Sequence, residues 1–186
     1  MPVLPEHYSP FRPRRPMTAW LTGLPGAGKT TLARALAASL REEGMDVLCL
    51  DANRVREGLS RDLGYSPVDR MENARRVAEV ARMGNDSGLF VIAALVSPLR
   101  AHRALARVLV GPERFIEVYV NTHVETCQTR DTKGMYVAAR QGLIDDFTGV
   151  SAPYEPPAAP HMSFDAGTET LDSAVMRLRR VLALER

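Results

Sequence analysis

The stretch Gly23-Leu24-Pro25-Gly26-Ala27-Gly28-Lys29-Thr30-Thr31 decides the fold of this 186-residue chain, because it satisfies the pattern Gly-x-x-x-x-Gly-Lys-Ser/Thr. Glycines in such a loop let the backbone curl until successive amides face a phosphate, and the following helix presents its positive end to the same anion. The lysine of this pattern reaches the β- and γ-phosphates, and the hydroxyl after it ligates magnesium. We therefore expect Lys29 and Thr30 to hold a nucleoside triphosphate with Mg²⁺.

The sequence on either side gives this loop the context that the mechanism requires. Thr18 to Thr22 has the length and composition of a strand, and Thr30 to Arg41 repeats Leu32, Leu36 and Leu40 at the spacing of a helix. A strand before the loop and a helix after it argue against an accidental match. A GTPase would add a base-reading run such as Asn-Lys-x-Asp, which the chain lacks. The loop, the length of the chain and its alternating strands and helices together favour a small-molecule kinase.

Beyond the loop, short apolar runs alternate with helical patterns along the chain. The apolar runs cover residues 18–22, 47–50, 89–96 and 115–120, and the helical patterns cover 30–41, 69–83, 102–110 and 173–184. This alternation predicts a three-layer α/β fold, in which a parallel sheet of about five strands is flanked by helices on both faces. Ligands of such sheets sit beyond the carboxyl ends of the strands, so the residues directly after each strand are the candidate site.

The composition bounds the class of protein. Hydrophobic residues make up 45% of the chain and charged residues 25%, which are globular proportions. No apolar run approaches the roughly 20 residues that a membrane-spanning helix needs. Lys and Arg number 24 against 22 for Asp and Glu, a balance too even for general nucleic-acid binding. With only Cys49 and Cys127 and no signal-like segment, we expect a cytoplasmic protein without a disulfide framework.

The prolines suggest how the chain is divided. Nine of the 13 prolines lie within residues 2–16 or 153–160, and proline favours irregular backbone for itself and the residue before it. We expect residues 1–17 to be a Pro/Arg-rich arm or linker and residues 18–186 to form one domain. Residues 153–160 should be a late loop of that domain.

Further polar segments follow the predicted strands in a recognisable order. They are Asp51 to Asn73, Ser97-Pro98-Leu99-Arg100, Arg130 to Tyr136, Asp146-Phe147-Thr148-Gly149 and Pro153 to Pro157. Together with the phosphate loop, they closely resemble the adenylylsulfate kinases over about Trp20 to Asp165. Those enzymes transfer the γ-phosphate of ATP to the 3′-hydroxyl of adenosine 5′-phosphosulfate (APS), giving 3′-phosphoadenosine 5′-phosphosulfate (PAPS). The resemblance also implies a homodimer and functional coupling to the ATP sulfurylase that makes APS.

The resemblance assigns the acceptor-binding roles residue by residue. Arg56, Arg70 and Asn73 match residues that hold the sulfate-bearing nucleotide. Tyr65 and Phe147 match two aromatic positions that sandwich its adenine, with Tyr65 in place of the more usual Phe. These assignments are physically coherent, because arginines offer planar donor forks to an anion and aromatic rings offer stacking area.

The resemblance also assigns a lid and a serine. Arg130 to Tyr136 matches a mobile lid that excludes water, with Arg130 near the ATP base and Lys133 near the phosphates of both substrates. Ser97 matches a position described as a phosphoserine intermediate. No activating base stands near Ser97 in the sequence, and direct in-line transfer needs no covalent step. We therefore prefer a contact between Ser97 and the acceptor nucleotide.

One departure from the family pattern concerns the chemistry. The acidic motif after the second strand usually begins Asp-Gly-Asp-Asn, and here it reads Asp51-Ala52-Asn53-Arg54. The second aspartate is the family's leading candidate for accepting the 3′-hydroxyl proton or organising magnesium water, and an amide cannot take a proton. General-base assistance is typically worth about 10²- to 10⁴-fold, and the lower part of that range suits phosphoryl transfer. We expect Asp51 to carry the remaining base and metal function.

This departure leaves two alternatives beside an APS kinase. The altered residues after strand two fit a kinase of a different nucleotide acceptor, since acceptor contacts concentrate there. The loss of the carboxylate at Asn53, together with the proline-rich arm, fits a catalytically weak nucleotide-binding domain that regulates a partner.

Overall fold

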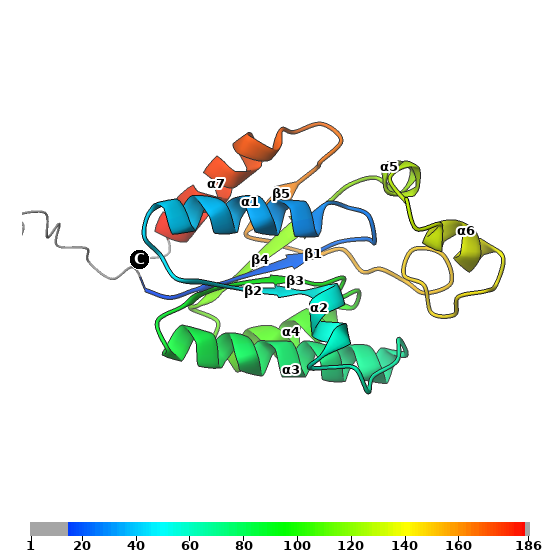
Figure 1. The fold of residues 1–186 in the computed structure, drawn as a ribbon, viewed down its shortest axis with the longest axis horizontal. Helices are drawn as coiled ribbons and strands as arrows, with labels where there is room; N and C mark the ends of the chain where they lie inside the picture. Colours follow the sequence, from blue (N-terminus) through cyan, green and yellow to red (C-terminus); the bar gives the residue numbers. More distant parts are fainter. Residues whose placement is uncertain (1–14, 185–186) are drawn as a thin grey trace, which may run out of the picture.

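A parallel sheet forms the middle layer of the protein, whose computed structural model describes residues 15–184 (Figure 1). Its strands are β1 (Thr18–Thr22), β2 (Val47–Asp51), β3 (Phe90–Ala94), β4 (Phe115–Val120) and β5 (Met162–Phe164). They lie in the order β2-β3-β1-β4-β5, and every neighbouring pair is parallel. The first strand is therefore central, and the order of the strands reverses around it. A crevice forms at such a reversal, beyond the carboxyl ends of the strands.

Helices cover both faces of the sheet, as the alternating pattern predicts (Figure 1). One face carries α1 (Lys29–Glu42) and α7 (Leu171–Leu184), and the other carries α3 (Pro67–Asp86) and α4 (Arg100–Val110). The apolar side chains accordingly form two buried clusters, one on each face. The predicted α/β fold is confirmed, including its parallel sheet and its three layers.

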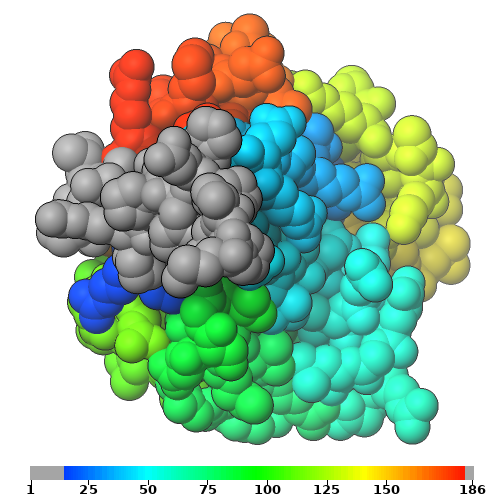
Figure 2. Space-filling model, turned by 60° about the vertical axis from the view of Figure 1, so that its left-hand side comes forward, coloured from blue at the N-terminus to red at the C-terminus, as the bar shows by residue number. Residues whose placement is uncertain are grey.

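Three short helices lie near the carboxyl ends of the strands. They are α2 (Ala52–Glu57), α5 (Val124–Thr129) and α6 (Met135–Arg140). Figure 2 shows from another side that the yellow-green segment containing α5 and α6 lies beside the blue segment that follows β1. The segment predicted as a lid thus lies next to the phosphate loop.

The structure differs from the sequence pattern at a few boundaries. The three-residue strand β5 is too short to stand out as an apolar run. Helix α3 begins at Pro67 rather than Asp69, because a proline is tolerated in the first turn and the Ser66 hydroxyl accepts a hydrogen bond from the Asp69 amide at 3.2 Å. Residues 153–160 are irregular, as expected. The proposed arm lies almost entirely outside the described residues.

Candidate active site

The phosphate loop joins the central strand β1 to α1 and has the backbone that its glycines permit. Gly26 has a φ of +76°, and a Cβ there would lie 2.9 Å from the carbonyl oxygen of Cys127. Gly28, with a φ of +103°, caps α1 without a side chain, and the first turn of α1 contains no acidic residue. The amides of that turn and the positive end of the helix dipole are therefore available to an anion.

Lys29 lies folded against this loop. Its Nζ donates to the carbonyl oxygens of Gly23 at 2.9 Å and Leu24 at 2.7 Å, and only 8% of the residue is exposed. Burial lowers the pKa of Lys29 to about 8, although Cys127 and Asp51 act in the opposite direction. The hydrogen bonds of this cation within the described residues go to neutral carbonyl oxygens, so a phosphate with full negative charge would be a stronger partner.

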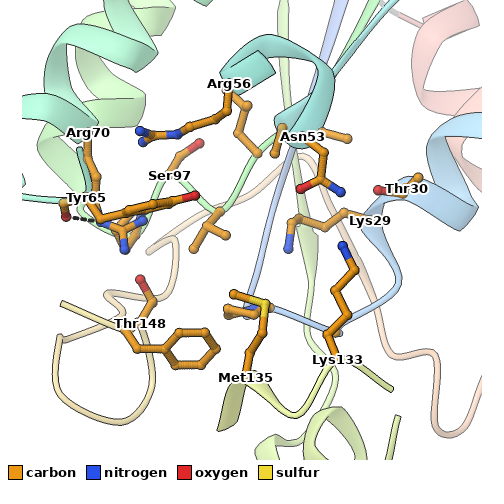
Figure 3. Close-up of a pocket in the computed structure, with 18 of the residues that line it drawn as sticks. Lys29, Thr30, Asn53, Arg56, Tyr65, Arg70, Ser97, Lys133, Met135 and Thr148 are labelled. Carbon is orange, nitrogen blue, oxygen red and sulfur yellow. Dashed lines mark hydrogen bonds between the residues drawn. The ribbon is translucent and has the colours of Figure 1, made fainter. Parts of the chain in front are cut away.

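Thr30 and Asp51 form an oxygen pair beside the loop. The Thr30 hydroxyl donates to Asp51 Oδ2 at 2.6 Å. Asp51 Oδ1 accepts from the backbone amide of Asn53 at 3.0 Å, and Asp51 thereby caps α2. Hydroxyl and carboxylate oxygens are ligands that suit Mg²⁺, which usually completes its shell with water and substrate phosphate. These two residues therefore fit the predicted metal-binding role. Asn53 projects beside Thr30 and Lys29 in Figure 3.

A cavity of about 500 Å³ opens beyond the ends of the central strands and collects most of the predicted site residues. Those that line it are Pro25, Gly26, Lys29, Thr30, Asp51, Asn53, Arg56, Tyr65, Arg70, Asn73, Ser97, Arg130, Lys133 and Phe147. Gly28 and Thr31 instead line a second cavity of about 540 Å³ at the start of α1, which also includes Gly26, Lys29, Thr30 and Arg130. Gly23, Leu24 and Ala27 line neither cavity. We call Gly23 to Thr31 the donor half of the site, because this loop is expected to bind the phosphoryl donor.

The opposite wall of the first cavity contains the residues expected to bind the phosphoryl acceptor, and we call it the acceptor half. It consists of Arg56, Tyr65, Arg70, Asn73, Ser97 and Phe147. Tyr65 lies between two guanidinium groups, with the ring centroid 4.3 Å from Cζ of Arg56 and 5.3 Å from Cζ of Arg70. Arg56 donates to the carbonyl oxygens of Leu63 and Gly64. Figure 3 shows these three side chains together on one side of the cavity. They form a planar, cationic surface suited to an anionic nucleotide.

Arg70 also ties α3 to the segment around Phe147. Its Nε donates to the carbonyl oxygen of Tyr65 at 2.8 Å, and its Nη2 donates to that of Asp146 at 2.7 Å. Burial and the nearby Arg56 lower the pKa of Arg70. Its hydrogen bonds are to neutral carbonyl oxygens, so an anionic ligand would be a stronger partner.

The predicted lid contacts the donor half directly. The Tyr136 hydroxyl donates to the carbonyl oxygen of Pro25 at 2.8 Å, and the Tyr136 ring meets Phe147 edge-on with centroids 4.9 Å apart. Arg130 Nη2 donates to the carbonyl oxygen of Ala166 at 3.0 Å. Lys133 points toward Lys29 in Figure 3. The lid segment therefore contributes to the walls of both cavities, and its mobility stays a prediction.

Ser97 has an unusual backbone that buried contacts maintain. Its φ is +39°, one of two positive values among the described residues other than glycine. Its Oγ accepts from Trp20 Nε1 at 3.0 Å, and its carbonyl oxygen accepts from Arg103 Nη1 at 2.7 Å. Arg103, which is 3% exposed, also pairs with Glu117 at 2.7 Å. Strain of this kind persists only where the surroundings enforce it.

The sequence pattern did not single out Arg103 or the Tyr136 hydroxyl. An arginine on an amphipathic helix reads as a solvated charge, and only the packing of α4 against the sheet shows that Arg103 is buried. In the sequence, Tyr136 stands out only as the last residue of the lid segment. Its contact with Pro25 joins residues far apart in the chain, so no local pattern reveals it.

The fold and the cavity together define the class of the protein, a P-loop kinase. A Gly-Lys-Thr phosphate loop at the end of the central strand faces a basic, aromatic-lined wall across one cavity. Within the described residues, no helix is long and apolar enough to cross a membrane.

Comparisons with known proteins place the chain within one family of that class. The family model for adenylylsulphate kinase matches residues 15–165. An adenylyl-sulfate kinase of Shewanella amazonensis is 52% identical over 159 residues, covering 86% of this chain and 80% of the relative. One from Pseudomonas aeruginosa is 47% identical over 173 residues, covering 93% and 88%.

A solved structure gives the same answer. The Mycobacterium tuberculosis APS kinase CysC, in complex with AMPPNP and APS, superimposes with a TM-score of 0.88 at 38% identity. The match covers 92% of this chain and 99% of that one. The chain belongs to the adenylylsulphate kinase family.

Proposed function

We propose that this protein transfers the γ-phosphate of ATP to the 3′-hydroxyl of APS, giving PAPS and ADP, a reaction of sulfate assimilation. One observation carries the proposal: the phosphate loop and the basic, aromatic acceptor half open into the same cavity. The CysC structure, which contains an ATP analogue together with APS, supports this assignment.

The donor half would bind ATP. The amides of Gly26 to Thr31 would surround the phosphates, and Lys29 would leave the carbonyl oxygens of Gly23 and Leu24 to bind the β- and γ-phosphates. Arg130 would lie against the base in the second cavity. Mg²⁺, held by Thr30 and Asp51, would neutralise charge on the phosphates.

The acceptor half would bind APS. Arg56 and Arg70 would exchange their carbonyl partners for the phosphosulfate, while Tyr65 and Phe147 would stack on the adenine. Asn73, Ser97 and Lys133 line the same cavity and would complete the contacts. The lid would exclude water, which would otherwise accept the phosphoryl group.

In the transfer step, the 3′-oxygen of APS bonds to the γ-phosphorus as the bond to the ADP oxygen breaks. The 3′-hydroxyl proton needs an acceptor, and the side-chain amide of Asn53 cannot take up a proton. We assign the proton to Asp51, whose carboxylate oxygens are oriented by Thr30 and the Asn53 backbone. Since phosphoryl transfer depends mainly on positioning and electrostatics, the outcome is a working but slowed kinase.

An acceptor panel tests the assignment. ADP release would be measured with saturating ATP and with APS, AMP, adenosine 5′-diphosphate derivatives or no acceptor, and the product would be identified by mass and by the position of the new phosphate. We expect saturable turnover with APS and a 3′-phosphorylated product. Saturable turnover of another nucleotide, with negligible turnover of APS, would instead establish a kinase of that acceptor.

A regulatory, catalytically weak domain is the second candidate, and Asn53 is the observation that favours it. Binding of ATP and APS without turnover would support that reading. Assembly as a homodimer, coupling to ATP sulfurylase, cytoplasmic location and the division into an arm of residues 1–17 and a domain of residues 18–186 stay predictions.

A further inference from the structure

Thr148 is a buried wall residue of the cavity, and its hydroxyl is unpaired within residues 15–184. The residue is 1% exposed, and its Oγ1 makes no hydrogen bond to any of the described residues. An unpaired buried hydroxyl destabilises the folded protein, so it needs an explanation. Figure 3 shows Thr148 with its oxygen directed to the side on which Tyr65 and Arg70 lie.

The loop around Thr148 is held from several directions. The amides of Val150, Ser151 and Ala152 all donate to the carbonyl oxygen of Phe147, and the Phe147 amide donates to Ser151 Oγ at 2.9 Å. On one side, Arg70 fixes the carbonyl oxygen of Asp146. These contacts determine where the hydroxyl lies, and none of them satisfies it.

Asn73 presents a second unpaired atom in the same cavity. It is 8% exposed, and its Oδ1 is buried and accepts no hydrogen bond from the part of the chain that the structure describes. An amide oxygen only accepts, whereas a hydroxyl both donates and accepts. The two atoms together suit a neutral ligand that carries both a hydrogen-bond donor and an acceptor. The edge of an adenine has this arrangement, and the adjoining aromatic residues offer its faces a stacking surface.

We propose that Thr148 is a further specificity-determining residue, whose hydroxyl hydrogen-bonds the edge of the acceptor's purine base. This proposal rests on the proposed function, since it takes APS as the acceptor. The unpaired hydroxyl then lowers the stability of the nucleotide-free protein, and APS binding removes this penalty by supplying a partner.

The test replaces Thr148 by Val, which keeps the shape and removes the hydroxyl. Calorimetry would measure the Kd for APS, and chemical denaturation would measure stability without ligand. We expect Thr148→Val to raise the Kd for APS by about three- to tenfold, the effect of one hydrogen bond, with ATP binding unchanged. Its unfolding midpoint should be equal to or above that of the natural protein. Thr148→Ser, which keeps the hydroxyl, should restore most of the affinity for APS.

Ser60 provides the matched control. Its hydroxyl is likewise buried and unpaired, but it does not line the cavity. Ser60→Ala should leave APS binding unchanged. If the natural protein binds APS and Thr148→Val binds it equally well, or if Ser60→Ala weakens binding as much, the proposal is wrong. If the natural protein binds no APS, the proposed function fails and this assignment fails with it.

Discussion

The two halves of the cavity are built in different ways. The donor half is one continuous stretch, Gly23 to Thr31, in which backbone amides and a helix end face the ligand. The acceptor half gathers side chains from α2, the segment between α2 and α3, α3 itself, the segment after β3 and the segment after α6. A substitution in a loop that binds through its backbone disturbs the whole loop, whereas single side chains of the acceptor half can be replaced one at a time. The departures from the family pattern, which are Ala52, Asn53 and Arg54 after β2 and Tyr65 further on, accordingly lie outside the donor half.

The largest effect is expected from Lys29→Met. Removing the cation that meets the transferred phosphate should lower kcat/KM by at least about 10³-fold for any acceptor. Steady-state ADP release measures this effect, and Arg34→Met provides an exposed control on the same helix. A variant that retains a tenth of the natural rate would contradict the role given to the donor half.

The same lysine should link stability to pH in the nucleotide-free protein. Its pKa is about 8 when folded against 10.5 in the reference state, so the unfolded chain binds more protons between these values and stability rises with pH there. Burial is the main cause of the lowered pKa, and Cys127 and Asp51 act against it, so keeping Lys29 charged at pH 7 costs on the order of 3 kcal/mol.

Thermal unfolding of the natural protein and Lys29→Met at several pH values checks this linkage. At pH 7.5 we expect the Tm of the variant to be at least that of the natural protein. As the pH rises to 10, the Tm of the natural protein should increase relative to that of the variant. Parallel Tm curves for the two proteins would mean that burial does not lower the pKa of Lys29.

A separable effect is expected in the acceptor half. Arg56→Ala should raise the KM for APS by about 10- to 100-fold, since it removes a charge-assisted contact, and should change the KM for ATP less than twofold. Arg82→Ala is the matched control, because Arg82 pairs with Glu79 on the exposed surface of α3. Equal increases in both KM values for Arg56→Ala would show that the two halves do not bind separately.

The smallest effect concerns the contact between the lid and the donor half. Tyr136→Phe removes the hydrogen bond to Pro25, so hydrogen exchange of the α6 amides should become about fivefold faster. Tyr119→Phe, on β4, should leave that exchange unchanged. Unchanged exchange in Tyr136→Phe would mean that the hydroxyl does not hold the lid in place.

The sequence predicts the donor half better than the acceptor half for a physical reason. The phosphate loop, its strand and its helix are adjacent in the chain, so a local pattern contains all of their geometry. Arg56, Arg70 and Phe147 could be grouped only through resemblance to a family, because folding alone brings their segments together. Nothing local distinguishes the buried Arg103 or Thr148 from ordinary polar residues.

The central claim is that this chain phosphorylates APS although Asn53 replaces the second aspartate of the family motif. Asp51, at the end of β2, is then the carboxylate that acts in the reaction. ADP release with saturating ATP and APS, compared between the natural protein and Asn53→Asp, tests the claim most directly. We predict turnover by the natural protein and a kcat about 100-fold higher in Asn53→Asp, with both KM values within twofold. If neither protein turns over while both bind ATP and APS, the claim is wrong and the chain is a nucleotide-binding module.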